Sequence, residues 1–235
     1  MAVTLLITVT IITKYPIEPQ EPFLIEKIAK LITHGTLQTY IKGEIIIRTD
    51  EPPPGVYCVK EGYVKAYTIT DLGEENLHII YGPNTIFPII WAITGRLRQI
   101  FYESMDEVLV YRISRQDFLT FTNTDPKDTQ AMLAHAIDMA NTSADRIDGL
   151  EYTHGYSRII YLLIALAERH GEPYGTGVII RAPVKHHDIA ASTNCSRETV
   201  SREMEKLEEL GLVDYHDHLI VISDLTQLQH ELLRV

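Results

Sequence analysis

The chain has 235 residues, of which 45% are hydrophobic and 23% charged, and its formal net charge is −11. These proportions are typical of a globular protein and exclude a chain that is disordered throughout. Two cysteines are too few for a disulfide scaffold or for a four-cysteine zinc or iron–sulfur site. The acidity disfavours a nucleic-acid coat protein or a polybasic membrane binder, although it is compatible with a small basic face.

Residues 1–22 form an N-terminal extension whose first 13 residues carry no charge. This apolar run is too short to span a bilayer and has neither a basic n-region nor a small-residue cleavage site. We therefore favour an added edge strand, or a start codon assigned too early, over a membrane anchor or secretion signal. No other apolar run approaches a membrane span, so we expect a cytoplasmic protein with no membrane partner.

Residues 23–125 predict a short helix, at about Phe23–Ile32, followed by a β domain. Its strands are short runs of β-branched and aromatic residues, separated by Gly or Pro. The predicted strands are Glu44–Arg48, Val56–Lys60, Tyr63–Ile69, His78–Tyr81 and Val108–Ile113. Regular spacing of short strands favours a rolled antiparallel sheet, with 71–73 as one hairpin tip.

Residues 126–152 predict one long helix with an apolar seam at 4-3-4-3 spacing. The seam consists of Leu133, Ile137, Ala140, Ala144 and Ile147. This spacing is typical of two paired helices, so we expect a homodimer. The alternative is a single amphipathic helix packed on its own core.

Residues 153–235 predict a differently built, compact domain. The predicted helices are Tyr156–Arg169, His187–Ser192 and Ser196–Leu210, and the predicted strands are Val178–Arg181, Val213–Tyr215 and Leu219–Ile222. Two helices joined by a three-residue turn and followed by a β-hairpin are the order of a winged helix-turn-helix. The fold class is therefore α+β: a β-roll, a long dimerisation helix and a C-terminal winged helix-turn-helix.

The second helix of the pair carries the functional pattern. Its core spacing places the charged residues Arg197, Glu198 and Arg202 on the opposite face. Arginine can bind guanine O6 and N7 bidentately and glutamate can accept from cytosine N4, so these residues suit the major groove. The alternative is a solvated face of i,i+4 ion pairs, which the surrounding turn, core and wing disfavour.

Residues 184–222, which contain this helix pair and hairpin, resemble the DNA-binding domain of the Crp–Fnr family of bacterial transcription regulators. The segment after Gly35 is similar to the family's cyclic-nucleotide-type β-roll, and the apolar seam to its dimerisation helix. The resemblance implies base contacts from Arg197, Glu198, Arg202 and Ser201. It implies phosphate contacts from Ser196, Thr199, His187 and His216, and Lys185 is a further candidate from its charge.

The chain departs from the family pattern in the turn and the wing. Asn194 stands where the family usually has glycine, and Asn tolerates the left-handed conformation. Asp217 and His218 stand where the family has Gly and Lys, so we expect a weaker grip on phosphate. Basic residues exceed acidic ones by only one between Arg181 and Lys206, which implies modest non-specific affinity.

The expected effector pocket is incomplete. The family's cyclic-AMP-binding members use a Gly-Glu pair and, about ten residues later, an Arg-Ser pair; here these positions hold Phe87-Pro88 and Arg98-Gln99. Thr142 and Ser143 lie near the family's adenine-contacting pair. We therefore expect an unknown effector other than cyclic AMP. Phe87, Ile89, Trp91 and Tyr102 either line an apolar cavity or form ordinary core, which the pattern slightly favours.

The sequence predicts no catalytic residue, metal site or cofactor. It contains no phosphate-binding glycine loop, nucleophile elbow or HExxH motif.

The expected partners are double-stranded DNA, a second copy of the chain and a small molecule, with RNA polymerase as a further candidate. The favoured operator is TGTGA-N6-TCACA, and the Fnr branch's TTGAT half-site is the alternative. The competing function is a β-roll module that responds to a cyclic nucleotide and has little DNA specificity.

Overall fold

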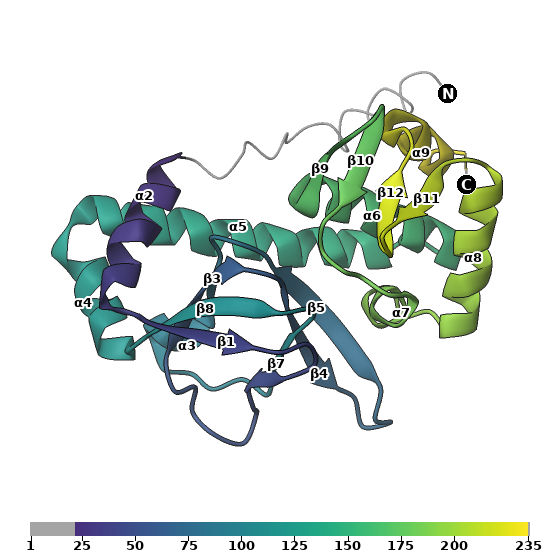
Figure 1. The fold of residues 1–235 in the computed structure, drawn as a ribbon. Coiled ribbons are helices and arrows are strands. Elements are labelled where there is room, and N and C mark those ends of the chain that lie inside the picture. The colour runs from purple at the N-terminus through teal and green to yellow at the C-terminus, as the bar shows by residue number, and fades with distance from the viewer. Residues whose placement is uncertain (1–21, 235) are drawn as a thin grey trace. The chain divides into compact units, whose positions relative to one another are not determined.

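The computed structural model describes residues 22–234, and its two compact units divide between Arg146 and Ile147 (Figure 1). The expectations for residues 1–13 lie outside this range. The β-roll, the long helix and the helix-turn-helix are all present, so the predicted fold class is confirmed. The described part of the chain contains no helix that is both long and apolar enough to cross a membrane.

The first unit contains eight strands and a set of flanking helices. The helices are α2 (Pro22–Leu31), η1 (Ile32–His34), α3 (Ile89–Thr94), α4 (Arg115–Thr124) and most of α5 (Pro126–Leu150). The strands are β1 (Thr36–Tyr40), β2 (Ile45–Ile47), β3 (Val56–Glu61), β4 (Val64–Ile69), β5 (Glu75–Tyr81), β6 (Ile86–Phe87), β7 (Phe101–Ser104) and β8 (Val108–Ile113). They form two four-stranded sheets, β1-β8-β3-β6 and β2-β7-β4-β5.

Strand β3 is buried on both faces of its sheet. Successive strand residues point to opposite faces. Val56 and Cys58 pack with the helices, whereas Tyr57 and Val59 pack with the second sheet. This double burial explains why β3 begins with an unbroken apolar run rather than an alternating one.

The sequence predicted the long strands better than the short elements. β8 has the predicted bounds, and the predicted turn is the tip of the β4–β5 hairpin, where Gly73 has φ +80° and donates to the Thr70 carbonyl at 2.9 Å. The pattern missed β1, β6, β7, α3 and α4. Elements as short as β6 and α3 bury too few residues to show a period.

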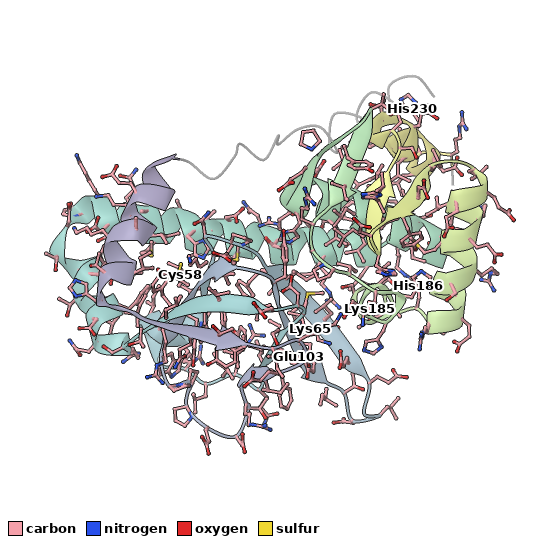
Figure 2. All side chains as sticks on the ribbon, viewed as in Figure 1. Cys58, Lys65, Glu103, Lys185, His186 and His230 are labelled. Atoms are coloured by element: carbon pink, nitrogen blue, oxygen red, sulfur yellow. The ribbon has the colours of Figure 1, made fainter. Side chains whose placement is uncertain are left out.

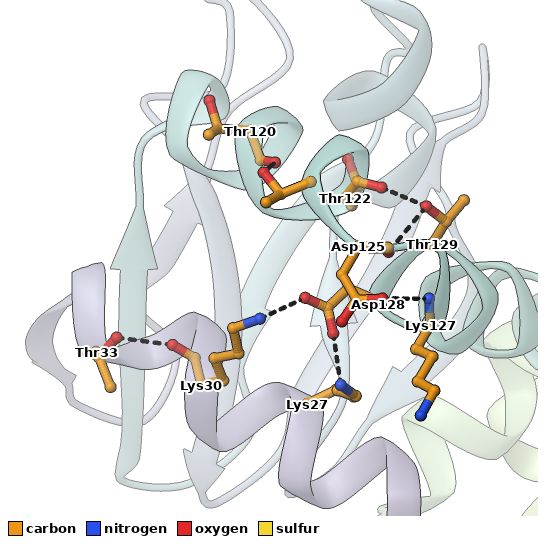
Figure 3. Close-up of polar contacts among 10 residues, drawn as sticks. Lys27, Lys30, Thr33, Thr120, Thr122, Asp125, Lys127, Asp128 and Thr129 are labelled. Carbon is orange, nitrogen blue, oxygen red and sulfur yellow. Dashed lines mark hydrogen bonds and ion pairs between the residues drawn. The ribbon is translucent and has the colours of Figure 1, made fainter.

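The start of α5 is joined to α2 by a buried ion cluster (Figure 3). Asp128 is fully buried and accepts from Lys27 at 2.8 Å and Lys30 at 2.7 Å. Burial by itself would raise the pKa of Asp128, but hydrogen bonds from the two lysines outweigh it and lower the pKa. The carboxylate therefore stays ionised and holds the two helices together.

Within its described residues, the second unit has one four-stranded sheet and four helices besides the end of α5. The helices are α6 (Gly155–His170), α7 (His186–Thr193), α8 (Arg197–Glu209) and α9 (Leu225–Leu232). The strands β9 (Gly171–Tyr174), β10 (Gly177–Ile180), β11 (Val213–His216) and β12 (Leu219–Ile222) pair in the order β11-β12-β10-β9. The sequence missed β9 and α9.

Gly149 lies inside the long helix, one residue before its end. The helix continues to Leu150, and Gly149 is buried against α6. A Cβ atom at Gly149 would lie 2.7 Å from the Tyr161 ring. Close approach of the two helices, rather than termination, therefore accounts for this glycine.

We expect Asp128→Asn to destabilise the first unit by about 3 kcal/mol, because it leaves two lysines without their buried counter-ion. A carboxyl group whose pKa is lowered on folding stabilises the protein above its unfolded pKa of about 3.9 and loses this contribution as the pH falls further. Urea unfolding at pH 7 and pH 3 measures both effects. Asp148→Asn, which changes an exposed residue of the same helix, is the control; equal stability of the two variants at pH 7 would contradict the assignment.

Candidate nucleic-acid interface

The turn between α7 and α8 is held by two local contacts. Asn194 adopts the left-handed conformation (φ 52°, ψ 43°) and caps α7 by donating to the Ala190 carbonyl. Ser196 then caps α8, since its hydroxyl accepts from the Thr199 N–H at 3.1 Å. The predicted left-handed Asn is confirmed, and together with the Ser196 cap it sets where α8 begins.

The two faces of α8 differ completely in exposure. Val200, Met204 and Leu207 are each 0% exposed and belong to the core of the unit. The predicted base-contacting residues all lie on the exposed side: Arg197, Glu198, Ser201 and Arg202. Burial of the apolar face therefore turns the whole predicted contact set outward.

The charged residues of this region are less available than the sequence suggests. Arg202 donates to Glu203 through Nε at 3.1 Å and Nη2 at 2.8 Å. Arg181 pairs with Glu172 at 2.6 Å, and Lys206 lies 3.6 Å from the centre of the Tyr156 ring. The basic residues between Arg181 and Lys206 that take no part in these contacts are Lys185 and Arg197.

Glu198 remains an ionised acceptor at the start of α8. Hydrogen bonds from its own backbone N–H and then from the Ser196 hydroxyl lower its pKa. An anion at this end of the helix also interacts favourably with the helix dipole. A carboxylate held in this way can accept a hydrogen bond from a base amino group.

His186 connects three elements of the helix-turn-helix, and sequence reasoning missed it (Figure 2). Its Nδ1 lies 3.0 Å from the Ser201 hydroxyl on α8, and its Nε2 lies 3.0 Å from the Tyr215 hydroxyl on β11. Burial raises the pKa of Tyr215 to about 12, so its hydroxyl keeps its proton. Ser201, predicted as a base contact, is thus tied to the wing. No periodicity in the sequence marks a bridge between residues so far apart.

The wing hairpin turns through two residues that both have positive φ. Asp217 has φ 49° and His218 φ 65°, between the paired residues His216 and Leu219. This is the geometry of a type I′ turn, for which Asn-Gly is the usual pair. His216 lies 3.4 Å from the Asp217 carboxylate, and its ring centre lies 5.0 Å from that of Tyr174.

The remaining predicted phosphate contacts cluster at the starts of the two helices. Lys185 and His187 are exposed at the start of α7. The hydroxyls of Ser196 and Thr199 are 3.0 Å apart at the start of α8. Backbone N–H groups at helix N-termini attract phosphate, so these positions fit the predicted role.

The predicted effector-pocket residues do not line one cavity. Phe87 is fully buried and stacks on Tyr57 at 5.4 Å and on Tyr102 at 5.0 Å between ring centres, inside the core between the two sheets. Ile89 and Trp91 pack in the other core, against the helices. The alternative of ordinary core, which the sequence slightly favoured, therefore describes these side chains.

The polar members of that predicted set lie on two elements, α5 and the segment between α3 and β7. Thr142 and Ser143 donate to carbonyls of their own helix, at 2.9 Å to Asp138 and 3.1 Å to Met139. Arg98 and Gln99 are exposed on the segment between α3 and β7.

Metal and thiol chemistry find no support in the residues from 22 to 234. No three His, Cys, Asp or Glu side chains gather there in a group that could hold a metal ion. Burial raises the pKa of the Cys58 thiol to about 12, which keeps it protonated.

Two family models match the chain. Residues 37–125 match the cyclic nucleotide-binding domain, and residues 157–231 match the Crp-like helix-turn-helix domain. The chain belongs to the Crp–Fnr family. It is a transcription regulator of this type with a helix-turn-helix DNA-binding domain.

Relatives and solved structures agree with this assignment. The chain is 23% identical to the Global nitrogen regulator of Nostoc, over 83% of this chain and 88% of that protein. It is 24% identical to the Cyclic AMP receptor protein of Thermus thermophilus, over 80% and 84%. The fold is similar to that of FixK2 from Bradyrhizobium japonicum, with a TM-score of 0.73, 22% identity, and coverage of 84% of this chain and 96% of that one.

Proposed function

We propose that the protein is a homodimer that binds a palindromic operator by inserting α8 into the major groove. The observation that carries this proposal is the exposed set Arg197, Glu198 and Arg202, which lies opposite the buried apolar face of α8. A helix of this kind in the family's DNA-binding domain suits base contacts by its N-terminal residues.

The chemistry of the set favours a half-site rich in G·C pairs. Arg197 and Arg202 suit guanine, and Glu198 suits the amino group of cytosine. The proposed operator is TGTGA-N6-TCACA; the alternative half-site is TTGAT, because Ser201 is shared with the Fnr branch. Two recognition helices about 34 Å apart would bind half-sites 10–11 base pairs between centres.

Contacts to the DNA backbone would come from the starts of α7 and α8 and from the wing. The proposed residues are Lys185, His187, Ser196, Thr199 and His216. Only one of them is a lysine or arginine, so the electrostatic contribution to binding is small. Specific binding then depends strongly on the base contacts.

The exposed seam of α5 supports a dimer. Leu133 is 58% exposed, Ile137 53% and Ile147 59%. The smaller members of the seam, Ala140 and Ala144, are exposed as well. A row of apolar side chains left uncovered along a helix fits a second copy of the same helix.

The effector is proposed to be a small molecule other than cyclic AMP. The Phe87 side chain fills the core at the position where the family's cyclic-AMP-binding members have a glycine, and Pro88 replaces the carboxylate.

RNA polymerase is a further proposed partner, because a transcription regulator acts on it. The same role implies that the protein works in the cytoplasm. We propose no catalytic activity and no cofactor.

We expect Ile137→Asp to convert the dimer to a monomer. A charge buried at the centre of a two-fold interface costs several kcal/mol unless the interface opens. Analytical ultracentrifugation at micromolar concentration measures this, with Ile69→Asp, an exposed apolar residue of β4, as the control. If the Ile137→Asp variant stays dimeric, the seam is not the dimer interface.

Substitution of Arg202 and of Lys185 should have different effects on DNA binding. Arg202→Ala should cost about 1–3 kcal/mol per half-site and relax the preference at one G·C pair. Lys185→Ala should weaken binding to all DNA sequences alike and reduce the dependence of the affinity on salt concentration. Fluorescence anisotropy with the operator and single-base variants, at several salt concentrations, separates the two. Selection from random DNA that returned no two-fold symmetric site would contradict the proposal.

The contact of His186 with Ser201 and Tyr215 predicts coupling in base discrimination. Tyr215→Phe removes only the hydroxyl that holds His186, so it should reduce discrimination at the base pair that Ser201 contacts. In a Ser201→Ala background the same change should have no further effect on discrimination. Additive effects in this double-mutant cycle would show that Ser201 acts independently of His186.

Cyclic AMP is expected neither to bind in the micromolar range nor to change operator affinity. Isothermal titration calorimetry at pH 7 tests this directly. A micromolar dissociation constant, with a binding heat that Arg98→Ala abolishes, would overturn the expectation. It would also restore the family's phosphate-binding role for Arg98.

A further inference from the structure

Both ring nitrogens of His186 face hydroxyl groups that belong to other elements. Nδ1 lies 3.0 Å from the Ser201 hydroxyl on α8, and Nε2 lies 3.0 Å from the Tyr215 hydroxyl on β11. His186 is the first residue of α7, and Asp188 fixes the backbone before it by accepting from the Lys185 N–H at 2.9 Å. The ring is therefore held on both sides and joins the two helices to the wing (Figure 2).

A neutral imidazole between two hydroxyls gives this row of hydrogen bonds a direction. One ring nitrogen carries the proton and donates, while the other accepts. If Nε2 accepts from Tyr215, then Nδ1–H donates to Ser201, and the proton of Ser201 is available to a third group. If Nδ1 accepts from Ser201, that proton is used on the ring. The tautomer of His186 thus decides what Ser201 offers to a partner outside the protein.

The acidities of the two hydroxyls favour the first arrangement. A phenol is a stronger acid than an aliphatic hydroxyl, and so it is the stronger hydrogen-bond donor to an imidazole nitrogen. Burial and then the charge of Glu208 raise the pKa of Tyr215 to about 12, so the phenol keeps its proton at neutral pH. Tyr215 therefore donates to Nε2, the ring proton stays on Nδ1, and Ser201 accepts from it.

The position of Ser201 makes this direction important for reading DNA. Ser201 is exposed on α8, one helical turn after the exposed Arg197 and on the same face. A serine hydroxyl that is free to rotate can donate to one base or accept from another, so it discriminates little. A hydroxyl that is fixed as a donor does discriminate. Guanine and thymine present acceptor oxygens in the major groove, whereas cytosine presents an amino group.

We propose that His186 is a positioning residue for base recognition, which fixes Ser201 as a donor and so selects guanine or thymine over cytosine at one position of each half-site. Tyr215 fixes the ring, and the wing thereby contributes to base selection without touching the base. The inference rests on the proposed function in that Ser201 contacts a base pair of the operator. The tautomer itself is a property of the free protein.

NMR of the free, full-length protein tests the tautomer in the absence of DNA. Long-range 1H–15N correlation spectra at about pH 8.5, where a histidine ring is neutral, distinguish a protonated ring nitrogen from an unprotonated one. We expect His186 to carry its proton on Nδ1. Tyr215→Phe should reduce the fraction with this tautomer, because Nε2 loses its donor. Tyr174→Phe, which removes a hydroxyl from β9 of the same sheet, is the control and should leave the tautomer unchanged.

Fluorescence anisotropy with single-base variants of the operator tests the consequence for recognition. The position that Ser201 contacts is the one at which Ser201→Ala removes the difference between thymine and cytosine. There the original chain should bind guanine or thymine about fivefold more tightly than cytosine, since one hydrogen bond is gained or lost. Tyr215→Phe and His186→Ala should each reduce this preference to about twofold or less, because the hydroxyl can then rotate.

The inference is overturned if the His186 proton lies on Nε2 in the original chain, or if Tyr215→Phe leaves the tautomer unchanged. It is also overturned if the substitutions at 186 and 215 both leave the base preference as it is. Any of these results together with intact operator binding would contradict this inference alone. A protein that binds no operator, although its tautomer is as expected, would overturn the proposed function and with it the selection of bases.

Discussion

The long helix α5 has to satisfy several different neighbours, and much of the first unit depends on how its faces are used. Asp128 at its start holds α2, while Met132 and Met139 pack into the two cores of the β-roll. A period of 3.6 residues places these contacts on one side. The opposite side, with Leu133 and Ile137, is left exposed. One helix can thus pack against the β-roll and still leave its apolar seam exposed.

Buried cations of the first unit are paired with carboxylates, with one exception. In the β-roll, Lys65 is paired with Glu75. The exposed Arg202 on α8 is paired with Glu203. Arg146, which is half-buried, has no such partner among the described residues.

The interior of the β-roll gives a physical reason for the departure from the family's nucleotide pocket. Phe87 stacks between Tyr57 and Tyr102, so an aromatic ring occupies the position where a glycine would leave backbone open to a ligand. The hydroxyls of Thr142 and Ser143 are satisfied within α5.

The sequence by itself determined the features that depend on local chemistry and on period. The N-cap Ser196, the left-handed Asn194, the buried face of α8 and the seam of α5 all follow from neighbouring residues, and the structure places them as expected. Short elements such as β6 and α3 bury too little to show a period.

Tertiary structure alone decided which distant side chains meet. The bridge from His186 to Ser201 and Tyr215, the cluster around Asp128 and the approach of Arg146 to Asn76 join residues at least 15 positions apart. Their partners are chosen by the packing of whole elements, a constraint that no local pattern in the chain contains.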